Sequence, residues 1–386
     1  MKVLRTTATF YPHVTGPAYQ AYKISEGLEQ RGHSSPIVTT GTIPTEEEPG
    51  YPPGMDKTDS FPFQVVRRRP LFSVDQYRMP PQAIYDYFAE SPDIVHCHGY
   101  QNAIKDTFYL GNLVDSTPFV IHGHGSFSKN NDPTIERSLQ FKLYDTVWSR
   151  TVDRADAVVV SSEQERKDAV SFGIDRGKIW TIPVGKEPSV YRSVPRDPPD
   201  DRLRVLFVGR LAPRRNVELL IDAVARLDRD DIELRIVGGE GTLSDSSREK
   251  YTRELQRQVA NNDIESKVAF TGPKYGEDLI REYRRAHLFV NPTHYENFGQ
   301  ANLEAAFAGL PLIATPTGVA LDLVEESKTG YLFEDRETLV DLLAGFSAED
   351  EDLSVMSDNI SEKAETEYAW DRILDQYCRL YDQATE

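Results

Sequence analysis

Residues 288–319 constrain the fold more than any other stretch, because they read as strand, turn, helix and strand. An apolar strand ends at Pro292, and a run of helix-forming residues begins at Gln300 and stops at Gly309. Glycine suits the left-handed position just past a helix end, and Pro311 then opens a second apolar strand. The pattern predicts one strand-helix-strand unit of a parallel sheet.

Two carboxylates lie around the start of this expected helix. Glu296 falls in the turn and Glu304 eight residues later, inside the helix; on one continuous helix the two would lie about 80° apart. With Glu296 in the turn, both can face the crevice at the carboxyl ends of the strands. The helix N-terminus suits a phosphate, and carboxylates accept hydrogen bonds from sugar hydroxyls. The unit therefore indicates a nucleotide-sugar pocket, although glutamates near a helix start can also serve only the helix dipole.

The same string resembles the E-x7-E segment of the family 4 glycosyltransferases, which have the GT-B fold. The matching residues are Pro292, Phe298, Gly299, Glu304, Ala305, Gly309, Leu310, Pro311 and Gly318. The resemblance implies a hexosyltransferase that retains anomeric configuration and needs neither metal nor another cofactor. It also implies donor-binding roles for Glu296, Asn297, Phe298, Gly299, Gln300 and Glu304, with Glu296 catalytic.

The rest of the chain extends this pattern. Short strands rich in Val and Ile alternate with helix-length segments, which predicts α/β architecture with parallel, doubly wound sheets. A length of 386 residues suggests two domains. We expect two Rossmann-like domains facing across a cleft: residues 1–190 bind the acceptor and residues 191–368 the donor. The resemblance implies that a last helix, residues 369–386, packs back on the first domain.

Composition limits the partners. The net charge is −18, from 62 acidic and 44 basic residues, so we expect no nucleic-acid partner. Such a surface also resembles that of proteins from salt-loving organisms. No apolar segment is long enough to span a bilayer and the N-terminus reads as a strand, so we expect a cytoplasmic protein. Residues 67–69, three arginines, are a weak cue for peripheral membrane contact, and a solvated charge run explains them better.

A second motif follows the first strand of the second half. Gly209, Arg210 and Arg215 resemble the family's GRL-x-x-x-K-G turn, with Arg215 in place of Lys and Asn216 in place of Gly. The resemblance implies that both arginines neutralise the diphosphate and so act in catalysis, because cations stabilise a leaving group that gains charge. The competing interpretation is a pair of solvated turn arginines.

The first half carries weaker signals. Gly16 stands where the family usually has a Gly-Gly pair that approaches the donor, but Thr15 precedes it and Pro17 has no N–H to give. A plain helix start explains Pro17 equally well. Residues 41–62 are polar and rich in acidic residues and proline, which indicates a lid or a disordered loop.

Four histidines end two apolar strands as H-x-H pairs: His96 with His98, and His122 with His124. Residues two apart on a strand share a face, so each pair points one way. A metal site is a minority interpretation, because no carboxylate accompanies them closely. The resemblance places His124 near the donor sugar as a catalytic residue and His98 on the acceptor side. His96 and His122 are expected to satisfy buried polar groups.

Other functions stay open at this point. A dehydrogenase is disfavoured because no G-x-G-x-x-G follows the first strand of either half. An epimerase or phosphorylase of the same fold, or a catalytically silent nucleotide-sugar-binding partner, remains as an alternative. The expected donor is a UDP-, GDP- or ADP-sugar, and the expected acceptor is a glycan or a lipid-linked molecule.

Overall fold

The computed structural model describes residues 1–11, 15–40, 61–74, 77–128, 144–239 and 246–386. The chain divides into two compact units: unit 1 is Met1–Val184 with Asp371–Glu386, and unit 2 is Gly185–Trp370. Most of the polar segment expected to be a lid or disordered, residues 41–60, lies outside the described residues.

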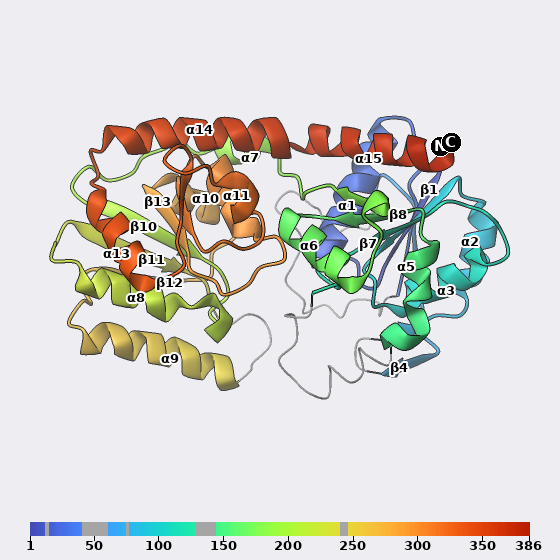
Figure 1. The fold of residues 1–386 in the computed structure, drawn as a ribbon, viewed down its shortest axis with the longest axis horizontal. Helices are drawn as coiled ribbons and strands as arrows, with labels where there is room; N and C mark the ends of the chain where they lie inside the picture. Colours follow the sequence, from blue (N-terminus) through green and yellow to red (C-terminus); the bar gives the residue numbers. More distant parts are fainter. Residues whose placement is uncertain (12–14, 41–60, 75–76, 129–143, 240–245) are drawn as a thin grey trace. The chain divides into compact units, whose positions relative to one another are not determined.

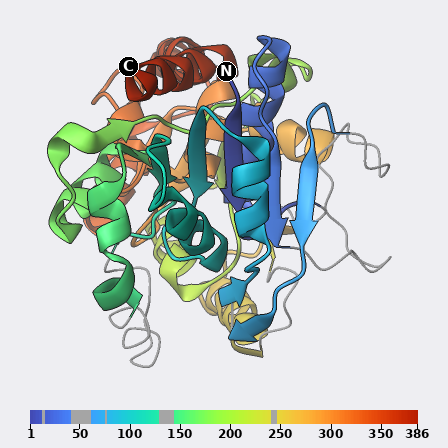
Figure 2. The ribbon, with the colours of Figure 1, turned by 90° about the vertical axis from the view of Figure 1, so that its right-hand side faces the viewer.

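Unit 1 is built on a seven-stranded parallel sheet with the order β3-β2-β1-β6-β7-β8-β9. Its strands are β1 (Val3–Thr7), β2 (Ile37–Thr40), β3 (Val65–Arg68), β6 (Ile94–His98), β7 (Phe119–His122), β8 (Ala157–Val160) and β9 (Ile179–Thr181). Its helices are α1 (Gly16–Gln30), α2 (Ala83–Glu90), α3 (Ala103–Asn112), α5 (Arg150–Arg154), α6 (Glu163–Phe172) and most of α15 (Trp370–Thr385). Figure 2 shows the strands side by side, with α2 and α3 in front of them.

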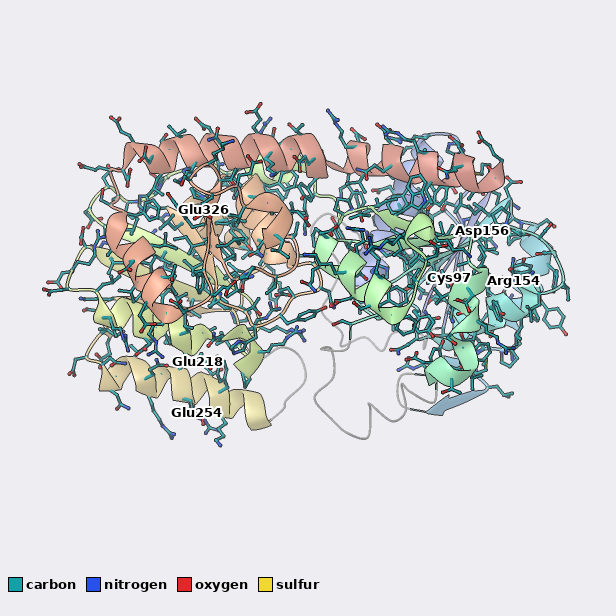
Figure 3. The ribbon with its side chains drawn as sticks, viewed as in Figure 1. Cys97, Arg154, Asp156, Glu218, Glu254 and Glu326 are labelled. Carbon is teal, nitrogen blue, oxygen red and sulfur yellow. The ribbon has the colours of Figure 1, made fainter. Side chains whose placement is uncertain are left out.

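The two faces of this sheet differ in chemistry. Alternate residues of a strand point to opposite faces, and Leu4, Val95 and Ile121 pack with α2 and α3 in an apolar core. Cys97, labelled in Figure 3, belongs to the same core. The opposite face of the same strands carries Arg5 and several histidines, which lie under α15. One face therefore stabilises the unit, and the other carries polar groups.

Unit 2 repeats the architecture with a six-stranded parallel sheet of order β12-β11-β10-β13-β14-β15. Its strands are β10 (Leu203–Val208), β11 (Ile232–Val237), β12 (Val268–Gly272), β13 (Leu288–Asn291), β14 (Leu312–Ala314) and β15 (Gly330–Leu332). Its helices are α7 (Pro188–Arg192), α8 (Val217–Arg226), α9 (Ser246–Asn261), α10 (Gly276–Arg284), α11 (Gln300–Phe307), α12 (Ala320–Leu323), α13 (Arg336–Gly345) and α14 (Glu351–Tyr368). They cover both faces of the sheet (Figure 1). This confirms the predicted α/β class with two parallel, Rossmann-like sheets.

The division between the units falls earlier than the sequence suggested. It follows Val184 instead of residue 190. Residues 188–192 form helix α7, and its Tyr191 stacks on Phe307 of α11 with ring centroids 5.6 Å apart. This aromatic pair packs α7, and with it the expected boundary at residue 190, into unit 2. A small antiparallel hairpin, β4 (Phe72–Val74) with β5 (Tyr77–Met79), was also not expected.

Candidate active site

In unit 2, the turn after β10 carries the predicted cations. Gly209 and Arg210 follow the strand, residues 213–215 form a short 3-10 turn, and α8 begins at Val217. Asn216 has a φ of 53°, in the left-handed region. Asparagine tolerates this conformation better than other residues with a side chain. It can therefore stand where the motif usually has glycine.

The close approach of two backbones fixes the position of this turn. The amide of Gly209 donates to the carbonyl oxygen of Val237, at 3.0 Å. A Cβ atom at Gly238 would lie 1.8 Å from the carbonyl oxygen of Gly209. Only glycine fits at residue 238, and its small size lets the ends of β10 and β11 meet.

Arg215 forms an ion pair with Glu296, and both side chains are mostly buried. Burial, together with the positive charges of Arg214 and Arg210, lowers the pKa of Arg215 to about 10, so it stays protonated at neutral pH. Arg210 itself is exposed. The turn thus gathers positive charge beside a carboxylate of the E-x7-E segment.

Glu304 lies inside α11 and accepts two hydrogen bonds. Its Oε1 accepts from Lys186 Nζ at 2.7 Å, and its Oε2 accepts from the Tyr283 hydroxyl at 3.1 Å. Lys186 also donates to Oε1 of Gln300, at 3.0 Å, and is only 7% exposed. The buried lysine therefore bonds two of the polar side chains of α11, Gln300 and Glu304.

The turn before α11 packs against the loop that carries Gly318. Gly299 has a φ of 87° and starts the helix. A Cβ at Gly318 would lie 2.5 Å from the carbonyl oxygen of Phe298, which accepts from the amide of Val319 at 2.6 Å. Beside them, the buried hydroxyl of Thr317 has no hydrogen-bond partner among the residues that the structure describes. A polar ligand could supply that partner, because buried hydroxyls rarely stay unsatisfied.

In unit 1, the strand ends bring the histidines together. His98 pairs in register with His122 across β6 and β7. The Nδ1 of His98 lies 2.9 Å from the Nε2 of His124, and the rings of His122 and His124 stack with centroids 3.9 Å apart. His124 has a φ of 50°, a backbone conformation that is uncommon for residues other than glycine. Gly16 lies exposed at the start of α1, where the Thr15 hydroxyl accepts from the amide of Ala18.

Below these rings lies a buried cation that the sequence analysis did not single out. The Nη1 of Arg5 lies 2.9 Å from Nδ1 of His96 and 3.3 Å from Nε2 of His98. Its Nη2 donates to the hydroxyl of Tyr381 at 2.8 Å, and its Nε to the Ser35 hydroxyl at 3.1 Å. Each of these partners is an uncharged acceptor. The side chain is fully buried.

Nitrogen atoms of His96, His98 and His122 lie within 4.8 Å of one another, close enough to hold a metal ion. Two of these rings already bond Arg5, however, and a metal ion there would meet a guanidinium charge at short range. His122 also lies 3.3 Å from the hydroxyl of Ser161, through its Nε2. The geometry favours a hydrogen-bonded cluster over a metal site.

Family models match consecutive parts of the chain. The model described as Glycosyltransferase Family 4 matches residues 14–189, and Glycosyl transferases group 1 matches residues 193–363. The chain belongs to the family 4 glycosyltransferases. The resemblance found in the E-x7-E segment is thereby confirmed, and the likeness to proteins of salt-loving organisms stays a prediction.

Curated relatives of this glycosyltransferase carry transferase names. A GDP-mannose-dependent alpha-mannosyltransferase of Corynebacterium glutamicum is 27% identical over 362 residues, which cover 86% of this chain and 77% of the relative. A D-inositol 3-phosphate glycosyltransferase of the same species is 29% identical over 249 residues. That match covers 60% of this chain and 58% of the relative, less than two thirds of its length.

Among solved structures, HepE of Anabaena in complex with UDP has a TM-score of 0.77 at 18% identity, covering 99% of this chain and 100% of HepE. At this identity the likeness establishes the fold alone. The glycosyltransferase therefore has the GT-B fold predicted from its sequence. No helix among the described residues has the length and apolar character needed to cross a membrane.

The glycosyltransferase places its predicted site residues in two groups. Unit 2 holds Gly209, Arg210, Arg215, Glu296, Asn297, Phe298, Gly299, Gln300 and Glu304, and unit 1 holds Gly16, His98 and His124. Direct contacts join Arg215 to Glu296 and His98 to His124.

Sequence reasoning missed Lys186, Tyr283 and Arg5. A charge within the apolar strand around Arg5 was a usable signal, because fully buried arginines require partners. Lys186 and Tyr283 contact Glu304 from 118 and 21 residues away along the chain. No spacing rule names such partners.

Proposed function

We propose that the protein is a retaining hexosyltransferase that uses a nucleoside-diphosphate sugar and needs no metal. The observation that carries this proposal is the contact between the phosphate-binding turn and the E-x7-E segment, made by Arg215 with Glu296. A cation for a diphosphate and a carboxylate for a sugar hydroxyl thus lie side by side within one unit. The names of relatives that use GDP-mannose, and the UDP complex of HepE, support a nucleotide-sugar donor.

Each group has a definite role in this proposal. Arg210 and Arg215 bind the diphosphate, and they bind it more tightly as the bond between the sugar and phosphate breaks and negative charge grows. Glu304 accepts hydrogen bonds from the ribose, and Glu296 accepts them from the donor sugar. When the diphosphate binds, Arg215 turns part of its hydrogen bonding from Glu296 to phosphate oxygens, which releases Glu296 for the sugar.

The chemical step follows the front-face course that the family resemblance implies. The bond from the anomeric carbon to the phosphate oxygen breaks, and the acceptor oxygen forms a new bond on the same face. The leaving phosphate takes the proton of the acceptor hydroxyl. His124 contacts the donor sugar, either through its side chain or through its backbone carbonyl, where positive charge develops at the anomeric carbon.

Metal independence is part of the proposal. Arg210 and Arg215 supply positive charge at the turn, which is the electrostatic work that a divalent ion performs in other phosphoryl sites. Their charges act on one another, since Arg210 and Arg214 both lower the pKa of Arg215. We expect chelators to leave the transfer rate unchanged.

A glycan or a lipid-linked molecule is the proposed acceptor, reached at the cytoplasmic surface of a membrane through unit 1. Exposed apolar side chains on α2 and just after α3 support such a contact: Tyr85 and Phe88, then Leu113 and Val114. The arginines at 67 and 68 are a poorer cue, because Arg67 donates to the carbonyl oxygen of Tyr11 and Arg68 pairs with Asp86.

A melting-temperature screen of UDP-, GDP- and ADP-sugars tests donor binding, because a ligand that binds only the folded protein raises the melting temperature with concentration. The anomeric configuration of the product, read by proton NMR, tests retention. A silent binding partner would bind a donor and form no product. Glu296→Ala should abolish transfer while donor binding persists; equal transfer rates for variant and wild type would remove Glu296 from the proposal.

A further inference from the structure

Arg5 controls the hydrogen bonding of two histidines at the end of the unit 1 sheet. It lies in the middle of β1, on the polar face of the sheet, and is fully buried. Arginine can only donate hydrogen bonds, and its guanidinium keeps its proton in proteins. Every nitrogen or oxygen that bonds Arg5 must therefore accept.

The acceptor role that Arg5 imposes on His98 also determines where the proton of His124 lies. The Nε2 of His98 lies 3.3 Å from Nη1 of Arg5, so it accepts and carries no proton. In a neutral imidazole the other nitrogen is then the donor. The Nδ1–H of His98 points at the Nε2 of His124, 2.9 Å away, so that nitrogen accepts in turn. By the same rule, His124 carries its proton on Nδ1.

We propose that Arg5 is a positioning residue that fixes the tautomers of His98 and His124, so that His124 presents a neutral Nδ1–H donor to a substrate oxygen. The substrate role rests on the proposed function, since it requires that His124 meets the donor sugar or the diphosphate. The tautomer chain itself rests only on the contacts described above. A reversed chain would place the Nε2–H of His98 against the Nη1–H of Arg5, two donors facing each other at 3.3 Å.

The surroundings keep both rings neutral. Burial lowers the pKa of His98 well below its usual range, and neighbouring His96, His124 and Arg5 lower it further. Burial also lowers the pKa of His124 to about 3. A neutral His124 cannot act as an imidazolium acid at physiological pH, and its Nε2 lone pair is already used by His98. Donation from Nδ1 is the chemistry left to its side chain.

Helix α15 supplies a further hydrogen-bond partner of Arg5, Tyr381. The hydroxyl of Tyr381 accepts from Nη2 at 2.8 Å and lies 2.7 Å from Nδ1 of His96. Tyr381 contacts Nη2 of the guanidinium, whereas His98 contacts Nη1. Tyr381→Phe therefore offers a matched control: it removes a buried hydrogen bond of Arg5 and leaves the contact between Nη1 and His98 in place.

The test measures histidine tautomers in the full-length protein by 15N NMR with histidine labelling, using His124→Gln to assign the signals. In the wild type, we expect Nδ1 of His124 to be protonated and Nε2 to be an acceptor. A proton on Nε2 of His124, or a doubly protonated ring at neutral pH, overturns the proposal. This measurement needs no substitution at Arg5 and no activity.

Two variants extend the test. Arg5→Met should convert His98 and His124 to a mixture of tautomers, whereas Tyr381→Phe should leave both as in the wild type. An unchanged single tautomer in Arg5→Met contradicts the proposal. If that variant does not fold, the wild-type spectrum decides.

Activity is the second measurement. Removing the groups that orient metal-bound histidines typically costs about 10- to 100-fold in affinity or activity. By analogy, we expect a kcat loss of that size for Arg5→Met and a smaller loss for Tyr381→Phe. If the wild type shows the expected tautomers but Arg5→Met loses no kcat, the fixed tautomers bring no catalytic benefit. If the wild type shows the expected tautomers but binds no nucleotide sugar, the proposed function is contradicted, whereas the tautomer chain from Arg5 to His124 is supported.

Discussion

The two sites described above, one in unit 1 and one in unit 2, each hold buried positive charge, and they accommodate it in different ways. In unit 2, Arg215 meets Glu296 and Lys186 meets Glu304, so each cation contacts a carboxylate. In unit 1, Arg5 contacts two histidines, a serine and a tyrosine, all uncharged. The same Rossmann-like scaffold thus carries an ion-paired site and a neutral hydrogen-bonded site.

The difference teaches how each site can respond to a ligand. Ion pairs can exchange partners, so an incoming diphosphate and sugar can compete for Arg215 and Glu296 at little net cost in charge. A chain of neutral rings cannot compensate a new charge, but it can hold one donor in a fixed direction. We therefore assign charge recognition to unit 2 and directional hydrogen bonding to unit 1.

The largest effect is expected at the proposed diphosphate site of unit 2. Arg215→Met should lower kcat by roughly 100- to 1000-fold, as the loss of one preorganised charge-stabilising donor typically does. Arg214→Met on the same turn is the matched control, because Arg214 is exposed and has no part in the proposed diphosphate contact. Steady-state kinetics with the best donor from the screen would show the difference, and equal losses in the two variants would contradict a specific role for Arg215.

A stability test addresses the second ion pair. Glu304→Met removes the carboxylate that accepts from buried Lys186, and breaking a buried pair on one side costs about 3 kcal/mol. Urea unfolding should therefore show a loss of that order. The double variant Lys186→Met/Glu304→Met should recover much of it, since apolar pairs often replace buried ion pairs without loss. No recovery would indicate that packing, and not charge, holds this contact.

The neutral site of unit 1 predicts a pH effect. The folded-state pKa of His124, about 3, lies below its usual value of 6.5, so the unfolded chain binds a proton that the folded protein does not. The contribution of His124 to the free energy of unfolding is therefore fully present above pH 6.5 and is lost as the pH falls toward 3. Between these values, His124→Gln should reduce the slope of unfolding free energy against pH by about 1.4 kcal/mol per pH unit.

Glu165 acts in the opposite direction, so the comparison must be made variant against wild type. Burial raises the pKa of Glu165 to about 7. Its contribution to the free energy of unfolding therefore falls as the pH rises from 4.5 to 7. Unfolding curves at several pH values would separate the two groups. An unchanged slope in His124→Gln would show that this ring is charged in the folded protein.

The smallest effect concerns the turn that carries Arg215. Asn216 has a φ of 53°, and a β-branched residue there should cost about 1–2 kcal/mol. Asn216→Val should lower the free energy of unfolding by that amount, whereas Asn216→Gly should be close to neutral. Similar losses in both variants would mean that the asparagine side chain, and not the backbone conformation, is what the turn needs.

The sequence predicted the fold well because its information is local. Val- and Ile-rich strands, the glycine after α11 and the E-x7-E spacing each report on neighbours within one strand-helix-strand unit. The contact of Arg215 with Glu296 joins two such motifs at strand ends of one sheet. Domain limits were less accurate, because Tyr191 reaches back to Phe307.

The missed residues share a different property. Lys186 and Tyr283 reach Glu304 from distant parts of unit 2, and Tyr381 reaches Arg5 from the C-terminal helix. Tertiary packing chooses such partners, and periodicity carries no trace of them. Only the presence of a charge inside an apolar strand pointed to Arg5.

Calorimetric titration of GDP-mannose and UDP-glucose into the wild type and into Arg215→Met tests the central claim most directly. We expect one of these donors to bind the wild type, and its affinity to fall by at least tenfold in Arg215→Met, about 1.4 kcal/mol or more, while Arg214→Met binds almost as the wild type does. Equal affinity for wild type and Arg215→Met would contradict the account, as would a wild-type protein that binds neither these nor any other nucleotide sugar.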